Sequence, residues 1–351
     1  MHLYNPENDL ALALGCRNYT PPPNADALRR AGALLPMWWA IEGDEIIAPS
    51  DCQGDADWLR RHFGLCGGIF SGGNSRLVPS PWGWSADACR RFESAGVPAT
   101  LLPGRDVVER MRALSHRRSS ISLLSEMNRS DLLPVETTDP DVVVEMERNY
   151  PGTFVKSPWS CSGRGVFCAS GIDAATLRAK ASGIIHRQGS VMVERGVKGK
   201  VADCASLFYI AGGEVEFRGY SLFHAEDRGV YAGNIVASQQ WLKGALTKYI
   251  PAQELENTVE EQRRALQRLI RNAYTGWVGI DMMVSRSEAD GFALHPCIEL
   301  NLRMTMGVVA MKVAERLAPA TPHIISWRRG APQGLTLLPP RHGFALCLTA
   351  I

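Results

Sequence analysis

Residues 292–307 read FALHPCIELNLRMTMG, and residues 276–284 just before them read GWVGIDMMV. Only the polar turn SRSEADG separates these two apolar runs, so we predict a β-hairpin or a pair of adjacent strands. Side chains alternate along a strand, which places Glu299 and Asn301 on the same face. If Asp281 faces the same way, three oxygen-bearing side chains converge on one spot.

The chemistry of these three side chains favours a magnesium site. Oxygen ligands from one or two carboxylates, completed by phosphate, are what Mg²⁺ takes in nucleotide sites. Arg303, two residues beyond Asn301, would supply a fixed cation beside a transferring phosphate. The alternative is an edge strand that shows solvated polar residues. We favour the metal site because uncompensated carboxylates are costly among the apolar neighbours Val278, Ile280, Met282, Met283, Ile298 and Leu300.

The composition is that of an ordinary globular protein. The chain has 351 residues, which is enough for two or three domains with a well-buried core. Hydrophobic residues make up 45% of the chain and charged residues 21%. A net charge of +2 gives no reason to expect nucleic acid or a membrane surface as a partner. No apolar run approaches the ~18 residues of a membrane span.

The cysteines and the N-terminal residues suggest a cellular location. Nine cysteines, an odd number, are scattered along the chain without a Cys-x-x-Cys pair. This pattern argues against a disulfide framework or a zinc site. The N-terminal residues MHLYNPENDL lack the basic start and apolar core of a signal peptide. We therefore expect a cytoplasmic protein with reduced thiols.

Three regions differ in their secondary-structure pattern. In residues 1–114, short apolar runs alternate with short helical segments. The apolar runs ALLPMWWAI, DEIIAP and GGIFSGG are typical of strands or turns, and the helical segments are DADWLRRHFG and SADACRRFESAG. This alternation predicts an α/β unit with a largely parallel sheet. Residues 115–193 contain two helical patterns followed by three strand-like segments. Residues 194–351 contain strands at DCASLFYIAG, EVEFRGYSLFHA and VYAGNIVAS. They also contain an amphipathic helix near 255–273, which precedes the two carboxylate-bearing strands.

A second chemical constellation is FVKSPWSCSGRGVF at residues 154–167. Lys156 lies on an apolar strand, and the loop after it is rich in serine and glycine. Small residues let backbone N–H groups approach phosphate oxygens, while a lysine on a strand adds a point charge. The order of lysine and glycines is not that of a Walker A loop. The alternative is a β-hairpin whose turn is Ser/Gly-rich, but a downstream metal triad favours a nucleotide site.

The order of these pieces resembles the ATP-grasp superfamily over roughly residues 115–310. Five elements occur in the family's order: the strand lysine, the Ser/Gly-rich hairpin loop, the strand end VMVE, then GID and IELNLR. The resemblance implies a Rossmann-like α/β domain at 1–114, a lid subdomain at 115–193 and a catalytic, metal-binding subdomain at 194–351. The fold class would thus be α/β and α+β, with two α+β subdomains enclosing the nucleotide.

The resemblance also assigns roles to single residues. It implies that Lys156 contacts the phosphates and that the loop Ser160–Gly165, with Ser160, Ser162, Gly163 and Gly165, folds over them. It implies that Met192, Val193 and Glu194 form the hinge strand against the adenine. Glu299 and Asn301 look like the family's metal-binding pair, with Asp281 upstream, and Arg303 is similar to its phosphate-stabilising arginine.

Two positions depart from the family pattern. The acid that often contacts the ribose is not at its expected place, because Gly199 is followed by Lys200 and Val201; Asp203 is the nearest substitute. A first phosphate-binding cation has two candidates, Arg117 and Arg118, and an exposed basic helix start is the other interpretation of both.

These features together predict an enzyme that uses ATP and Mg²⁺ to join a small-molecule carboxylate to an amine. The expected route is an acyl phosphate, protected from water by the Ser/Gly-rich loop as a lid. One alternative is a small-molecule kinase of the same fold. Another is a nucleotide-binding protein without turnover, which the missing acid keeps open. The sequence leaves the oligomeric state open, with a homodimer as the candidate.

Overall fold

The computed structural model describes residues 1–73, 77–160, 165–225, 231–287 and 291–351. They form two compact units. The first unit contains Met1–Arg112, Gly233–Leu242 and Arg303–Ile351, and the second contains Ala113–Ala232 and Lys243–Leu302. Among the described residues, no helix is long and apolar enough to cross a membrane. The predicted mixture of a parallel sheet with antiparallel sheets is confirmed.

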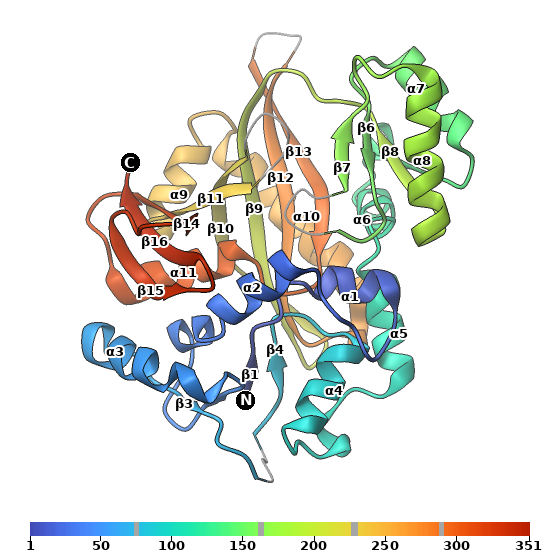
Figure 1. Ribbon diagram of the computed structural model, residues 1–351. Helices are drawn as coiled ribbons and strands as arrows, with labels where there is room; N and C mark the ends of the chain where they lie inside the picture. The colour runs from blue at the N-terminus through green and yellow to red at the C-terminus, as the bar shows by residue number, and fades with distance from the viewer. Residues whose placement is uncertain (74–76, 161–164, 226–230, 288–290) are drawn as a thin grey trace. The chain divides into compact units, whose positions relative to one another are not determined.

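The first unit is built around a short parallel sheet in the order β3-β2-β1-β4 (Figure 1). Its strands are β1 (His2–Leu3), β2 (Glu45–Ile46), β3 (Gly68–Ile69) and β4 (Ser80–Pro81). The connecting helices are α1 (Asn8–Leu14), α2 (Pro23–Ala31), α3 (Gln53–Phe63), α4 (Ala86–Ser94) and α5 (Arg105–Leu114), with 3-10 turns at Leu35–Trp38, Ser50–Cys52 and Ala99–Leu101. The turn at Leu35–Trp38 replaces a possible strand, because Pro36 suits the first turn of a helix and cannot donate to a sheet.

The C-terminal residues join this first unit through an antiparallel sheet. The strands are β11 (Tyr231–Val236), β14 (His323–Arg329), β15 (Leu335–Arg341) and β16 (Phe344–Ala350), in the order β11-β14-β16-β15. Two helices complete this part of the chain, α9 (Gln239–Leu246) and α11 (Met306–Leu317). Helices α2 and α3 pack on β15 and β16, so the last 49 residues belong with the first 112. The division at 114/115 and 193/194 remains a prediction.

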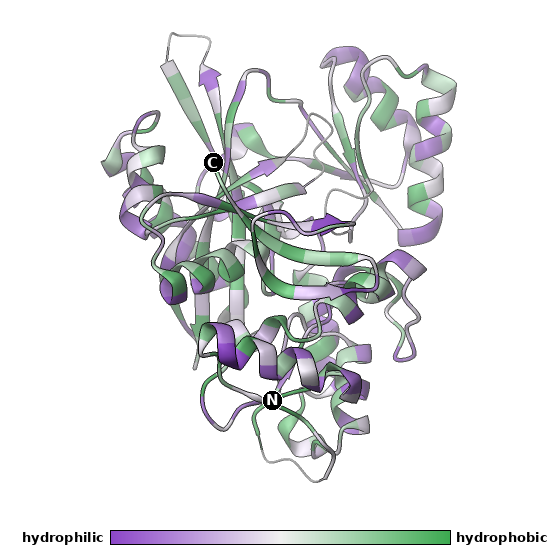
Figure 2. Ribbon diagram, turned by 60° about the vertical axis from the view of Figure 1, so that its left-hand side comes forward, coloured by the Kyte–Doolittle hydropathy of each residue, from purple (hydrophilic) through white to green (hydrophobic). Residues whose placement is uncertain are grey.

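The second unit contains two sheets. One is a four-stranded sheet in the order β5-β8-β6-β7, with β5 (Val135–Thr137), β6 (Phe154–Lys156), β7 (Val166–Cys168) and β8 (Val191–Glu194). Helices α7 (Pro140–Asn149) and α8 (Ala174–Gln188) cover it, and their apolar sides form a core with Val155, Val191 and Val193. Both helices alternate hydrophilic and hydrophobic bands, as Figure 2 shows.

The other sheet of this unit is antiparallel, with strands in the order β13-β12-β9-β10. The strands are β9 (Lys200–Ala211), β10 (Glu214–Ala225), β12 (Gly276–Ser287) and β13 (Gly291–Asn301). Helix α10 (Ala252–Ile270) follows the predicted amphipathic segment, ends in a 3-10 turn at Arg271–Ala273, and packs against β10 and α6 (Ser119–Glu126). A 3-10 turn at Ser130–Leu132 follows α6.

Gln262 connects helix α10 to the antiparallel sheet of the second unit by hydrogen bonds. Its side chain is fully buried, with 0% exposure. The Gln262 amide donates to the carbonyl oxygen of Pro296 at 2.7 Å and accepts from the Ser206 hydroxyl at 2.6 Å. Buried polar groups left without such partners are costly, so one glutamine holds β9 and β13 to the same helix.

We predict that Gln262→Ala lowers the free energy of unfolding by about 3 kcal/mol, because it removes two buried hydrogen bonds and leaves two polar groups without this partner. Urea denaturation followed by circular dichroism measures the change. Gln253→Ala is the control, since Gln253 begins the same helix and is exposed. Its effect should stay within about 0.5 kcal/mol. Equal effects of the two substitutions would contradict the role given to Gln262.

Candidate functional site

The three predicted metal-binding residues come together on β12 and β13. Asp281 lies directly opposite Glu299 in the strand register, and Gly279 lies opposite Asn301. The Asn301 amide donates to Asp281 Oδ2 at 3.1 Å. The predicted hairpin therefore forms with all three oxygen-bearing side chains on adjacent positions. Within the described ranges, no three His, Cys, Asp or Glu side chains group as a metal site, so the candidate set is two carboxylates and one amide.

A bulge in β13 sets this register. Asp281 pairs with Glu299 and Met283 pairs with His295, so two extra residues lie on the β13 side between the pairs. Pro296 lies in the bulge, where its missing N–H leaves no ladder bond unmade. Its carbonyl is held by the buried amide of Gln262. The bulge and its support from α10 thus place Glu299 opposite Asp281.

Arg117 completes the carboxylate side of the site. Its Nη2 donates to Glu299 Oε1 at 2.8 Å, and its Nη1 donates to the Ser157 carbonyl at 3.4 Å. The backbone N–H of Arg117 donates to the Pro158 carbonyl at 3.0 Å. The residue is only 7% exposed. Of the two candidates for a first cation, Arg117 therefore lies at the site, whereas the neighbouring Arg118 is exposed and pairs with Glu136.

Lys156 and Glu194 form an ion pair on the other sheet of the second unit. The pairing of β6 with β8 places Lys156 opposite Met192 and Phe154 opposite Glu194. Lys156 is 7% exposed, so its ammonium is a largely buried charge that needs a partner. Without a ligand, the candidate phosphate-binding cation is thus neutralised by the candidate hinge carboxylate.

The buried thiol of Cys297 is influenced by charged groups from both sheets of the second unit. Burial raises the pKa of this thiol, and the carboxylates of Asp281, Glu194 and Glu299 raise it further, whereas the ammonium of Lys156 lowers it. The four charged groups come from β12, β8, β13 and β6. Because charge effects fade with distance, Cys297 has charged neighbours on both sheets of the second unit.

Two buried polar atoms of the site lack a partner in the described part of the chain. They are Nε of Arg117 and the hydroxyl oxygen of Ser160. An unpaired buried donor costs about 1–3 kcal/mol, so native proteins rarely leave one without a reason. A donor on a guanidinium and a hydroxyl both suit an anion. The residues therefore fit a phosphate group.

The loop between β6 and β7 is described only at its two ends. Gly165 has φ +75°, which suits glycine, and a Cβ at this position would collide with Ser157. The Gly165 carbonyl accepts from the Ser157 N–H at 2.7 Å, which closes the base of the loop. Ser162 and Gly163 lie outside the described residues, as does most of the predicted lid.

The remaining predicted residues occupy several different places. Met192 and Val193 are buried on β8, and Val193 packs in the core beneath α7 and α8. Asp203 on β9 lies opposite Met283 and pairs with Lys200 at 2.8 Å. Arg303 belongs to the first unit, where its Nε donates to Asp9 Oδ2 at 2.8 Å. The spacing of residues in the sequence gave no signal for the partners of Arg303 or Arg117.

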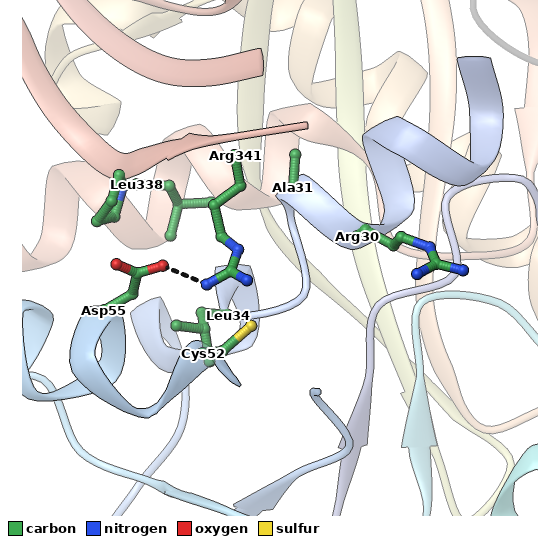
Figure 3. Close-up of a pocket in the computed structure, with 8 residues that line it drawn as sticks. Arg30, Ala31, Leu34, Cys52, Asp55, Leu338 and Arg341 are labelled. Carbon is green, nitrogen blue, oxygen red and sulfur yellow. Dashed lines mark hydrogen bonds and ion pairs between the residues drawn. The ribbon is translucent and has the colours of Figure 1, made fainter. Parts of the chain in front are cut away.

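A small pocket in the first unit does not serve as a competing site. Its lining includes Cys52 and Arg341, and Arg341 is held by Asp55 at 2.9 Å (Figure 3). Asp51, outside the lining, holds Arg341 at 2.5 Å. Burial raises the pKa of the Cys52 thiol to about 11, so the thiol is protonated and a poor nucleophile at neutral pH. The charged groups of the lining are already paired: Arg30 with Asp26, and Arg341 with Asp55.

No protein-family model matches the chain, and neither does any curated protein. Solved structures do match. N5-carboxyaminoimidazole synthetase from Staphylococcus aureus, complexed with ADP, is 11% identical with a TM-score of 0.53, covering 91% of each chain. The biotin carboxylase domain of 2-oxoglutarate carboxylase from Hydrogenobacter thermophilus is 13% identical with a TM-score of 0.51, covering 93% of this chain and 84% of that one.

A third matching structure identifies the fold. A protein from Archaeoglobus fulgidus assigned to the ATP-grasp superfamily is 11% identical with a TM-score of 0.50, covering 100% of this chain and 98% of that one. The chain has the ATP-grasp fold. The expected resemblance is thus confirmed at the level of architecture. At this identity the ATP-grasp matches carry no residue-level assignment, so the roles of single residues depend on the geometry above.

We predict that inorganic triphosphate binds the protein and that Arg117→Gln weakens this binding about 10-fold or more, because a charged hydrogen bond contributes about 1.5–3 kcal/mol. Isothermal calorimetry measures the dissociation constants. Arg118→Gln removes the same charge from the exposed neighbour and should leave affinity unchanged. Equal losses in both variants would indicate a general charge effect instead of a site at Arg117.

Proposed function

We propose that the protein is an ATP- and Mg²⁺-dependent ligase that joins a carboxylate to an amine through an acyl phosphate. The observation that carries this proposal is the pair of buried cations held by carboxylates, Lys156 by Glu194 and Arg117 by Glu299. Asp281 lies opposite Glu299 in the strand register, and two buried polar atoms, on Arg117 and Ser160, have no partner among the described residues. The second unit would thus supply both the cations for the phosphates and the oxygen ligands for a metal. The ATP-grasp fold supports the same function.

The nucleotide would be held by groups on both sheets of the second unit. Lys156 and Arg117 would bind phosphate oxygens, and the Ser160 hydroxyl would donate to one of them. We propose that the loop to Gly165, including Ser162 and Gly163, supplies backbone N–H groups. The backbone of β8 at Met192, Val193 and Glu194 would face the adenine, and Asp203 remains the candidate for the ribose.

Asp281, Glu299 and Asn301 would hold Mg²⁺. Two carboxylates and one amide, with phosphate oxygens completing the set, match what this ion takes. When bound, the ion supplies charge neutralisation for the transferring phosphate. Binding would then break the ion pair between Arg117 and Glu299. Arg117 would pair with a phosphate and Glu299 with the ion, so both charges would be compensated before and after binding.

The side chains of this site would act by positioning the substrates and by compensating the charge on the phosphate oxygens. A substrate carboxylate attacks the γ-phosphorus, the bond to the ADP oxygen breaks, and an acyl phosphate forms. An amine then attacks the acyl carbon, inorganic phosphate leaves, and the amine loses a proton. Lys156 and Arg117 stabilise the charge on the phosphate oxygens during the first step. Arg303 is kept as a further candidate for this role, with Asp9 as its partner before a ligand binds.

The structural neighbours support the proposal without specifying the substrates. The Hydrogenobacter protein was seen with MgADP and bicarbonate, and the Staphylococcus synthetase with ADP. We propose small-molecule substrates for this chain, a cytoplasmic location and a homodimer. The eight cysteines of the described residues are all free, which agrees with a reducing compartment.

We expect purified protein with MgATP to release ADP only when a carboxylate and an amine are both present, in a screen of paired substrate libraries. Glu299→Gln should abolish this release because it removes a metal-binding oxygen charge while keeping the shape. Glu261→Gln is the control and should stay active, because Glu261 is a partly exposed carboxylate on α10 that pairs with Arg129. ADP release with a single hydroxyl substrate would indicate a kinase. ATP binding without ADP release would indicate a nucleotide-binding protein that lacks turnover.

We predict that Lys156→Ala weakens the binding of ATP by about 1.5–3 kcal/mol and that of adenosine much less, since the lost contact is a charged hydrogen bond to phosphate. Calorimetry with both ligands measures the difference. Lys180→Ala serves as control, because Lys180 lies on α8 over the Phe167 ring. Equal losses for ATP and adenosine in Lys156→Ala would place the lysine away from the phosphates.

A further inference from the structure

The chain segment that leads to Ser160 is held by the end of helix α8. Gln188 is the last residue of this helix, and its side-chain amide binds both backbone polar groups of Trp159. Its Oε1 accepts from the Trp159 N–H at 2.9 Å, and its Nε2 donates to the Trp159 carbonyl at 3.2 Å. One side chain thus pairs with a single residue as a residue of a neighbouring antiparallel strand would.

The backbone at Gln188 is itself fixed. Gly189 ends α8 with φ +88°, in the left-handed region that favours glycine, and its N–H donates to the Ile185 carbonyl at 2.7 Å. The next residue, Ser190, donates its hydroxyl hydrogen to Glu136 Oε1 on β5 at 2.6 Å. The end of the helix is therefore bound to the sheet that it covers.

The residues just before α6 contact the same segment. The Arg117 N–H donates to the Pro158 carbonyl at 3.0 Å. The ring of His116 lies edge-on to the ring of Trp159, with the ring centroids 4.5 Å apart. Trp159 is 7% exposed and His116 is 2% exposed. Residues 157–160, the loop arm, are therefore buried and held by contacts from two other parts of the second unit.

The loop arm ends in a donor that suits an anion. The Ser160 hydroxyl is buried and has no partner among the described residues, and the same is true of Nε of Arg117. A Cβ added to Gly165 would lie 3.3 Å from the Cβ of Ser160, so the two described ends of the loop are close together. Ordering a backbone costs conformational entropy, so a donor on a backbone that is already fixed binds an anion more tightly.

We propose that Gln188 is a positioning residue for the phosphate groups of the nucleotide. Its two hydrogen bonds fix the backbone of Trp159, and thereby the hydroxyl of Ser160, before an anion arrives. Gln188 would act on the phosphates only through Ser160. The effect on nucleotide binding rests on the proposed function, whereas the fixing of the loop arm does not.

The opposing interpretation is purely structural. In that interpretation, the bonds between Gln188 and Trp159 only satisfy polar groups at the edge of a packed core, and they contribute to the free energy of unfolding alone. The two interpretations differ in one respect. A positioning role depends on the presence of the Ser160 hydroxyl, whereas a contribution to stability does not.

The first test measures hydrogen exchange of the Trp159 amide in the full-length protein without ligand, by nuclear magnetic resonance. Gln188→Met removes both hydrogen bonds and keeps the length, the zero charge and the helix propensity of the side chain. We expect this amide to exchange about 10-fold faster or more in the variant, because it loses its acceptor. Gln188→Asn, with a shorter side chain, is a second variant with the same expected direction. Unchanged exchange in both variants overturns the proposal.

The second test measures binding of inorganic triphosphate by calorimetry. We expect Gln188→Met to weaken this binding about 5-fold or more, because the donor is then no longer held in place. The same substitution should weaken binding less than about 2-fold in a Ser160→Ala background, since residues that act through one another are not additive. Equal losses in the two backgrounds overturn the proposal.

Val143→Ala is the matched control for stability. Val143 is 0% exposed and belongs to the core formed by α7, α8 and the four-stranded sheet, so its truncation destabilises this part of the protein without removing a hydrogen bond. We expect this variant to bind triphosphate like the wild type at a temperature well below unfolding. A loss as large as that in Gln188→Met would attribute the effect to stability and overturn the proposal.

The outcome is separable from that of the ligase proposal. Triphosphate binding that depends on Gln188, together with no ADP release for any substrate pair, sustains the positioning role and overturns the ligase. Triphosphate binding that is weakened by Arg117→Gln and unchanged by Gln188→Met sustains the phosphate site and overturns the role given to Gln188.

Discussion

The pairing of β12 with β13 is the constraint on which the candidate site depends. Side chains on paired strands are fixed by register, so a slip of one residue would turn Glu299 and Asn301 to the other face. The bulge at Pro296 and its hydrogen bond to Gln262 fix that register. The core helix α10 is thus connected to the metal-binding candidates through one buried amide.

Charge compensation is the second constraint. Lys156 pairs with Glu194 and Arg117 pairs with Glu299, so two buried cations are neutralised within the second unit. A buried charge left alone is far more costly than a buried pair. In the function that we propose, a polyphosphate with a cation would replace these pairs by offering matching charge to both members. The nucleotide and its metal would then bind more favourably together than either would alone.

The sequence predicts local features well and distant partners poorly. The strands around Asp281 and Glu299 follow from alternation over a few residues, and the helix near 255–273 follows from its apolar spacing. Arg117 and Glu299 are 182 residues apart, and no periodicity relates them. The C-terminal strands β14 to β16 join the first unit through pairing with β11 and packing of α2 and α3, which local patterns do not encode. The partners of Arg303 and Glu7 are equally non-local.

Both units contain buried polar atoms without a partner among the described residues. In the second unit these atoms include a guanidinium N–H of Arg117 and the Ser160 hydroxyl. In the first unit, Oε2 of Glu7 is a carboxylate acceptor beside arginines that are partly engaged. Buried donors favour an anion. In the ligase that we propose, Arg117 and Ser160 would therefore serve the phosphates of the nucleotide, and the pairs Lys156–Glu194 and Arg117–Glu299 would keep the charges compensated until that anion is bound.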